Sequence, residues 1–96
     1  MAEVYTYERS EELNKILKKL CRRDKVRFEA TIKKLEEVCQ NPLHYKNLQH
    51  DLKEFRRVHV DTSFVLVFKV DENLKCIRFE DLDHHDNIYK KWRKKV

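Results

Sequence analysis

Two histidines in the C-terminal half, His59 and His85, could divide the proton transfers of a phosphodiester cleavage that uses no metal. Such a reaction takes a proton from a ribose 2′-OH, stabilises the charge that grows on the phosphoryl group, and returns a proton to the leaving oxygen. Imidazoles ionise near neutral pH, and the guanidinium of Arg56 or Arg57 could clamp two phosphate oxygens. Tyr89 follows His85 by four residues, so on a helix it shares that face and could orient the substrate.

Other kinds of site find little support in the composition. The chain contains no glycine, which excludes the glycine-rich loops that hold phosphates in NTPases and dinucleotide-binding domains. His84 directly precedes His85, and neighbouring residues coordinate one metal only where a bend turns both side chains inwards. We therefore expect no metal and no cofactor at the site. For the two histidines of the proposed pair, the competing interpretation is that they are ordinary surface side chains.

The first forty residues carry the pattern of a short strand followed by two helices. Val4–Tyr7 is β-prone, and Ser10 can cap a helix whose first turn holds two acids. Asp24 can cap a second helix, which Asn41 and Pro42 stop. In both stretches apolar residues recur at intervals of three and four, which is typical of one buried helix face. These residues are Leu13, Ile16, Leu17, Leu20 and Cys21, then Phe28, Ile32, Leu35 and Cys39.

The second half changes to the two-residue period of strands. There Arg57 and His59 point to one face of a strand and Arg56 points to the other. Phe64–Val70 is almost wholly apolar, as expected of a central strand covered on both faces. Leu74–Phe79 follows as its antiparallel neighbour after a polar turn. Residues 43–53, between the two halves, are expected to form a loop with a turn of helix.

A final helix completes the predicted fold. Asp83 can cap it, and Trp92 lies on the same face as Tyr89. The elements together predict an α+β fold in which an antiparallel sheet of about four strands packs against the N-terminal helical hairpin, with a short C-terminal helix. Residues 1–96 are expected to form one domain, because this length supports a single hydrophobic core.

The net charge of +5 originates near the end of the chain. Five of the 22 bases lie in residues 90–95, which leaves 17 bases against 17 acids elsewhere. This charge suits a polyanion such as RNA or an acidic peptide, and the alternative is a surface that only keeps the protein soluble. Three cysteines without CxxC spacing, and no apolar leader, indicate a reducing cytoplasm. The longest apolar run has five residues, so no membrane association is expected.

The stretch YKNLQHDLKEFRRVHVDTSFVLVFKV and the ending DHHDNIY resemble the RelE/ParE superfamily of toxins from toxin-antitoxin systems. Within it they are most similar to the YafQ-like branch of mRNA interferases. An aromatic-arginine pair of that branch is matched by Phe55 and Arg56, and a histidine-valine pair begins at His59. The branch also has a histidine followed four residues later by an aromatic residue, matched by His85 and Tyr89.

This resemblance implies a RelE-like fold and a type II toxin that a cognate antitoxin keeps silent. It also implies a metal-independent endoribonuclease that cleaves mRNA in the ribosomal A site by 2′-OH attack. By the same resemblance His59 and His85 carry the acid-base work. Arg56 binds phosphate and Tyr89 positions the substrate. No small-molecule cofactor is implied.

Further residues are expected to contact the substrate: Arg57, His50, Asp61, Lys90 and Lys91. The first is the alternative clamp, and the last two begin the basic tail. His50 or His44 stands in the region where the branch has an upstream histidine. An acid that many members place four residues after the strand histidine is replaced here by Ser63, and Asp61 could substitute for it. The arginine that the RelE branch carries before the central strand is absent, since the chain reads Ser63, Phe64, Val65.

Two other functions agree with the same sequence. A ParE-like toxin would inhibit a topoisomerase by binding alone and would need no histidine pair. A degenerate family member would bind RNA or a partner through the lysine-rich tail without cleaving anything. Variants His59→Ala and His85→Ala that still inhibit growth would favour the ParE-like toxin. Binding that weakens steeply with salt and is lost on deleting residues 90–96, without RNA cleavage, would favour the degenerate member.

Overall fold

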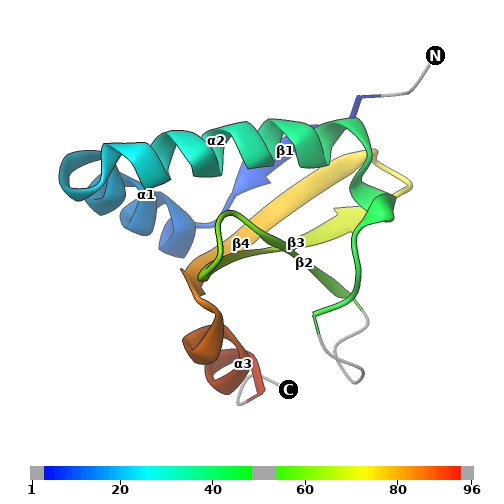
Figure 1. The fold of residues 1–96 in the computed structure, drawn as a ribbon. Helices are drawn as coiled ribbons and strands as arrows, with labels where there is room; N and C mark the ends of the chain where they lie inside the picture. Colours follow the sequence, from blue (N-terminus) through cyan, green and yellow to red (C-terminus); the bar gives the residue numbers. More distant parts are fainter. Residues whose placement is uncertain (1–3, 49–53, 94–96) are drawn as a thin grey trace.

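The computed structural model describes residues 4–48 and 54–93 of the chain. The elements are β1 (Thr6–Arg9), α1 (Glu11–Arg23), α2 (Lys25–Gln40), the 3₁₀ helix η1 (Pro42–His44), β2 (Phe55–His59), β3 (Phe64–Asp71), β4 (Cys76–His84) and α3 (His85–Arg93). The first strand thus lies two residues later than predicted, and the last strand is longer than predicted. Figure 1 shows the hairpin of α1 and α2 over one face of the sheet and α3 on the other side.

The four strands form a mixed sheet in the order β1-β4-β3-β2. β3 is antiparallel to both neighbours, whereas β1 runs parallel to β4, and this pairing differs from the expected antiparallel sheet. The helical hairpin is the cause, because it returns the chain to the start of β1, where the Tyr5 N–H donates to the Cys39 carbonyl oxygen at 3.1 Å. β2 therefore runs in the same direction as β1. The chain reverses between β2 and β3 and again between β3 and β4, so β4 also runs in the direction of β1. The α+β architecture itself is confirmed.

Two of the three predicted helix caps are confirmed, whereas Asp83, predicted to cap the last helix, lies in β4 and its Oδ1 accepts from the His84 N–H at 2.7 Å. The Leu13 N–H donates to Ser10 Oγ at 3.0 Å, and the Arg27 N–H donates to Asp24 Oδ1 at 3.1 Å. The predicted buried stripe of α1 is only partly right, because Cys21 is exposed. Figure 1 gives the reason, since the turn of the hairpin extends past the edge of the sheet.

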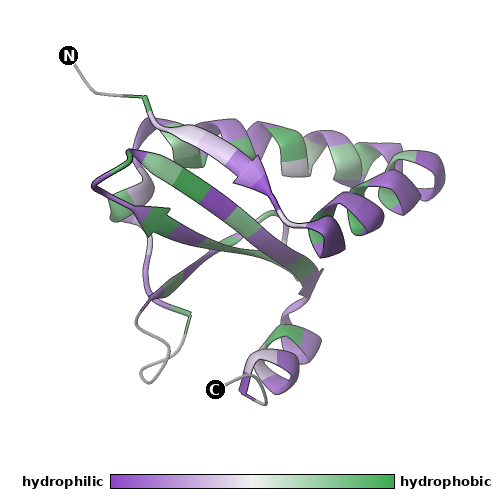
Figure 2. Ribbon diagram, turned by 180° about the vertical axis from the view of Figure 1, so that it is seen from behind, coloured by the Kyte–Doolittle hydropathy of each residue, from purple (hydrophilic) through white to green (hydrophobic). Residues whose placement is uncertain are grey.

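The sheet has a hydrophobic core on each face. Leu66 and Phe68 pack against the helical hairpin, while Val65 and Val67 pack beneath α3. All four side chains are fully buried, which confirms that β3 is a strand covered on both faces. Figure 2 shows hydrophobic and hydrophilic bands alternating along the strands. Within residues 4–48 and 54–93, none of the helices has the length and apolar character that crossing a bilayer requires.

Candidate active site

The alternation of β2 sends the two candidate arginines to opposite faces of the sheet. Arg57 and His59 pair with the two valines of β3 that pack beneath α3. Directly opposed residues of antiparallel strands share a face, so both lie on the face that carries α3, here called the α3 face. Arg56 instead pairs with Phe68, which packs against the helical hairpin.

Arg56 is therefore not brought to the histidines, although the family resemblance implies a phosphate-binding role for it. Its Nη1 donates to the carbonyl oxygen of Tyr45 at 2.6 Å. The contact joins β2 to the segment after η1, where the Asn47 backbone forms a bridge with that of Arg56. These bonds indicate a structural role for the Arg56 guanidinium at the edge of the sheet.

Arg57 has the environment that Arg56 lacks. Its Nε atom is buried and has no hydrogen-bond partner. No ion pair within the described part of the chain involves it. A buried guanidinium nitrogen without an acceptor is costly, because it has lost water and gained no bond in return. Arg57 as a whole is partly exposed, although this nitrogen is closed to solvent.

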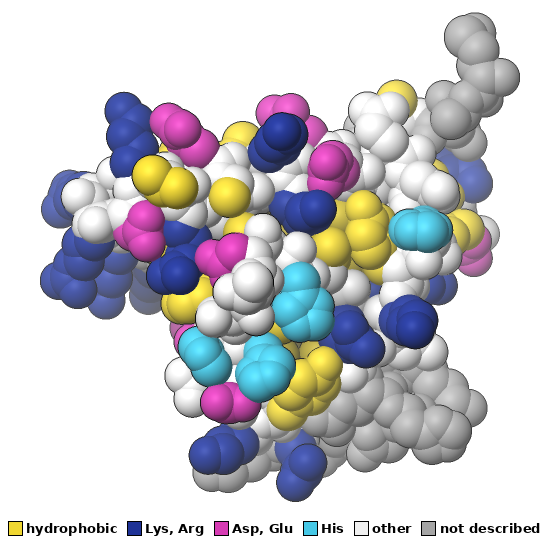
Figure 3. Space-filling model, in the orientation of Figure 1, with side chains coloured by type: hydrophobic (Ala, Val, Ile, Leu, Met, Phe, Trp, Pro, Cys, Tyr) yellow, Lys and Arg dark blue, Asp and Glu magenta, His cyan; other side chains and the backbone are white. Residues whose placement is uncertain are grey.

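His59 and His85 lie at the same end of the sheet. His59 and Asp83 both pair with Val65 of the strand between them, so about two strand spacings, roughly 10 Å, separate their backbones. The His85 N–H donates to the Ser63 carbonyl oxygen at 2.8 Å, which fixes the start of α3 beside the start of β3. Both imidazoles are exposed. Figure 3 shows histidine side chains gathered above α3, with basic side chains beside and below them.

Tyr89 lies next to His85, as the spacing of four residues predicts. The two rings are 6.4 Å apart between centroids and meet at 74°. Tyr89 is half-buried and packs against the core beneath α3. Its ring therefore has a fixed position beside the imidazole.

A buried carboxylate holds α3 on the sheet. Asp81 is only 1% exposed, and its Oδ2 accepts from Trp92 Nε1 at 3.1 Å and pairs with Lys91 Nζ at 3.0 Å. The Trp92 ring also packs on Phe55 of β2 at 4.7 Å between centroids. These contacts join α3 to the inner strand β4 and to the edge strand β2.

The position of Asp81 depends on an irregularity in the sheet. The register shifts between Val67 and Phe68, so Val67 pairs with Asp81 while Phe68 pairs with Phe79. Glu80 is the extra residue of this β-bulge. In a regular strand Asp81 would share a face with Phe79, and the bulge turns it to the opposite face. Asp81 was not among the residues expected at the site, because no pattern in a single sequence marks a bulge.

Lys91 contributes to the same anchor rather than standing free in a basic tail. Its Nζ pairs with Asp83 Oδ2 at 3.2 Å as well as with Asp81. Burial alone would lower the pKa of Lys91, but the hydrogen bonds and charges of Asp81 and Asp83 raise it above its ordinary value. Lys90, by contrast, is exposed.

Asp61 lies in the turn between β2 and β3 and contacts α2. Its Oδ1 accepts from the N–H groups of Ser63 and Phe64, both at 2.8 Å, and its Oδ2 pairs with Arg27 Nε at 2.8 Å. Burial would raise the pKa of Asp61, but the bond from Arg27 and the two backbone bonds lower it below its ordinary value. The carboxylate is thus occupied by the fold, which weakens its expected role towards substrate.

Two further histidines were candidates in the sequence. His44 is exposed in η1, where its ring contacts Tyr45. His50 lies outside the described residues. Among the described residues, one group brings three metal-ligating side chains together, and it consists of His84, His85 and Asp86.

A separate hollow of about 480 Å³ lies beside the helical hairpin and includes none of the expected site residues. It is lined by Arg9, Asn14, Leu17, Lys18, Cys21 and Phe28. We give the α3 face more weight, because that face gathers the histidines and the unpartnered arginine nitrogen. An open face also suits a polymer, which does not need to be enclosed.

The sequence places the chain in a family. The profile of the ParE toxin of the type II toxin-antitoxin system parDE matches residues 5–89. The chain belongs to this family. It is 60% identical over 88 residues to a protein of Methanocaldococcus jannaschii named "Putative toxin RelE4", and the match covers 92% of this chain and 94% of that protein. The predicted membership of the RelE/ParE superfamily is thereby confirmed, and the protein is a toxin of a toxin-antitoxin system.

Solved structures share the fold. A mutant of the E. coli toxin RelE in its free state matches with a TM-score of 0.74 at 20% identity over 98% of this chain and 99% of that one. YafQ in the E. coli DinJ-YafQ complex matches with a TM-score of 0.71 at 23% identity over 88% of this chain and 98% of that one. These likenesses confirm the RelE-like fold predicted from the sequence.

Proposed function

We propose that this toxin is a metal-independent endoribonuclease that cleaves mRNA on its α3 face. The observation that carries the proposal is the unpartnered Nε of Arg57, buried on the same face as His59 and beside the start of α3 with His85. Bidentate binding of phosphate suits arginine, and a phosphodiester could accept from Nε once the Arg57 side chain moves to open this atom to the ligand. Arg57 thus takes the clamp role in place of Arg56.

The chemistry requires one proton acceptor and one proton donor on either side of the bound phosphate. One imidazole removes the 2′-OH proton as the oxygen attacks phosphorus, and the other protonates the 5′ oxygen as it leaves. His85 Nδ1 lies 2.9 Å from Asp86 Oδ1, so the carboxylate fixes the proton on Nδ1 and Nε2 is left to exchange a proton with RNA. The products are a 2′,3′-cyclic phosphate and a free 5′ hydroxyl.

Tyr89 positions the substrate in this scheme. Its ring is fixed beside His85 and offers a flat surface on which a base can stack. Lys90 supplies a further positive charge at the exposed side of α3, where the RNA backbone would pass. For His50 and Asp61, a contact with the substrate stays a prediction from the sequence.

A cognate antitoxin is the second partner in this proposal, and the site of action is the ribosomal A site in the cytoplasm. The YafQ structure named above is a complex with DinJ, and another structure with this fold is the toxin-antitoxin complex RelBE2 of Mycobacterium tuberculosis. A face that attracts RNA also attracts an acidic segment, which can order itself as it binds.

Expression of the toxin followed by mapping of new RNA 5′ ends tests the proposal. We expect cuts within reading frames, and none when His85→Ala is expressed at the same level. A requirement for the ribosome is tested by comparing naked and translated mRNA in a purified system. Growth inhibition that survives both His59→Ala and His85→Ala, with no new RNA ends, would instead support a toxin that acts by binding alone.

A further inference from the structure

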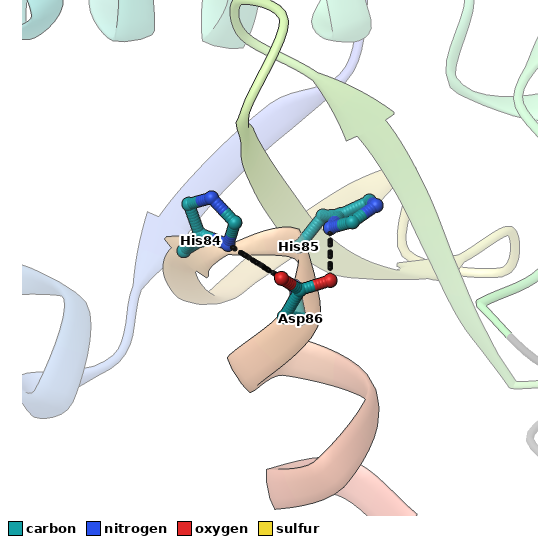
Figure 4. Close-up of side chains that lie close together, drawn as sticks. All are labelled: His84, His85 and Asp86. Atoms are coloured by element: carbon teal, nitrogen blue, oxygen red, sulfur yellow. Dashed lines mark hydrogen bonds and ion pairs between the residues drawn. The ribbon is translucent and has the colours of Figure 1, made fainter.

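The junction of β4 and α3 folds two adjacent histidines around one carboxylate. The strand ends at His84 and the helix begins at His85, so the chain bends between them. Figure 4 shows the two imidazoles on either side of the Asp86 side chain, each directed at one of its oxygens. His84 Nδ1 lies 3.7 Å from Asp86 Oδ2, and His85 Nδ1 lies 2.9 Å from Asp86 Oδ1. Such a bend is the condition under which neighbouring histidines can share a metal.

The spacing fits a small transition-metal ion. The three potential ligand atoms all lie within 4.8 Å of one another. A tetrahedral ion with bonds of about 2.0 to 2.2 Å holds its ligand atoms roughly 3.3 to 3.6 Å apart. The two observed nitrogen-oxygen distances, 2.9 and 3.7 Å, bracket that separation, so small rotations of the side chains would suffice.

The donor set favours zinc-like ions over magnesium. Two imidazoles and one carboxylate suit Zn²⁺ and its neighbours, whereas Mg²⁺ prefers oxygen ligands alone. The Asp86 N–H donates to His84 Nδ1 at 3.3 Å, so this nitrogen carries a lone pair, which a metal would take in place of the N–H. The positive end of α3 opposes a cation, and the charge of Asp86 offsets that effect. Asp86 is exposed and His84 is partly so, which leaves room for a water as fourth ligand.

We propose that His84, His85 and Asp86 form a binding site for a divalent zinc-like ion that switches the toxin off. The inhibitory part rests on the proposed function, because it requires His85 to exchange protons with RNA. A metal on Nδ1 of His85 would occupy its carboxylate partner and turn the ring, so the imidazole could no longer serve the RNA. Nuclease and metal-bound forms would then exclude each other.

Calorimetric titration of the full-length protein, without a histidine tag, with Zn²⁺ tests the site. We expect one strong site per chain and a loss of affinity of about tenfold or more in His84→Ala and in Asp86→Asn. His44→Ala is the matched control, since it removes an exposed histidine outside the group, and its affinity should equal that of the parent. Mg²⁺ should give no binding heat. Absence of zinc binding, or equal affinity in all variants with circular dichroism unchanged, would overturn the site.

Cleavage assays test the switch separately. Zn²⁺ should inhibit RNA cleavage by the parent, while His84→Ala should keep its activity and lose its sensitivity to zinc. Equal inhibition of parent and variant would overturn the switch even if the ion binds. If the parent binds zinc but cleaves no RNA, the proposed function fails and the metal site stands, so the two proposals fail in different experiments.

Discussion

Arg57 and Arg56 differ by one position and by their whole environment. The buried Nε of Arg57 has no partner, whereas the Nη1 of Arg56 already donates to a backbone carbonyl. Neighbouring residues of a strand point to opposite faces. An alignment with the family motif that is shifted by one residue would therefore assign the phosphate-binding role to the wrong arginine. The sequence alternation predicted these faces correctly, and the face on which Arg57 lies is the reason that we propose it as the clamp.

Single substitutions of these arginines should separate activity from stability. Arg57→Ala should lower RNA cleavage by about 10²-fold, because the phosphate loses a charged bidentate partner worth roughly 3 kcal/mol. Stability should change little, since the Arg57 Nε makes no hydrogen bond within the described residues. Initial rates on one RNA and urea denaturation measure the two effects.

Arg56→Ala should give the reverse pattern. It removes the 2.6 Å bond to the Tyr45 carbonyl, and we expect a loss of about 1 kcal/mol in the free energy of unfolding with near-parental cleavage. If Arg56→Ala abolished cleavage while Arg57→Ala remained active, the assignment of the clamp to Arg57 would be wrong.

At the scale of elements, α3 is held by one buried carboxylate. Asp81 bonds to both Trp92 and Lys91, and the β-bulge at Glu80 turns it to this face. Because α3 carries both His85 and Tyr89, this anchor sets the position of two residues of the proposed site. A helix of nine residues has little stability of its own and depends on such contacts.

Replacing Asp81 by Ala should loosen α3. The change leaves the Trp92 N–H and the Lys91 ammonium without their buried acceptor, and we expect about 2 kcal/mol of destabilisation. Trp92 is the single tryptophan, so its fluorescence reports on α3 alone. Its emission should shift to longer wavelength as water reaches the ring. An unchanged spectrum and an unchanged unfolding midpoint would show that Asp81 does not anchor the helix.

The turn between β2 and β3 is tied to α2 by Asp61, and this tie should depend on pH. Its pKa is lowered in the folded state, so its contribution is present above the unfolded value of about 3.9 and is lost as the pH falls through the folded value. Asp61→Asn should therefore cost about 1 kcal/mol at neutral pH. The gap to the parent should close as the pH falls from about 5 towards 2. A constant gap in urea denaturation across that range would contradict the role of the charge.

At the scale of the molecule, sequence patterns predicted the elements well and the long-range details less well. The caps at Ser10 and Asp24 and the two-sided strand β3 follow from local chemistry, which a single sequence displays directly. The parallel pairing of β1 and the bulge at Glu80 depend on how distant segments meet, which no local pattern encodes. The same holds for the candidate site. The anchoring contacts of Asp81 and Lys91 could not be predicted, because they depend on the bulge and on the packing of α3 against the sheet.

Deletion of the basic tail, residues 90–96, is a poor test of its charge. Deleting residues 90–96 would remove Trp92 and Lys91, which anchor α3, so the loss of charge would be mixed with the loss of a helix. Lys90→Gln with Arg93→Gln changes charge only at exposed positions. In RNA binding, the slope of log affinity against log salt should fall by roughly 0.7 for each phosphate that the variant no longer neutralises. An unchanged slope would show that these two side chains do not bind the backbone of RNA.

The chemistry of the cut ends tests the central claim most directly. Purified toxin is added to a translation reaction on a defined mRNA, and the new 3′ ends are examined for 2′,3′-cyclic phosphate. We predict cyclic phosphate ends with the parent and a rate about 10² to 10⁴-fold lower with His59→Ala or His85→Ala, while both variants stay folded. Ends that carry a 3′ hydroxyl, or cuts that persist at the parental rate in both variants, would contradict a histidine-driven 2′-OH attack on the α3 face.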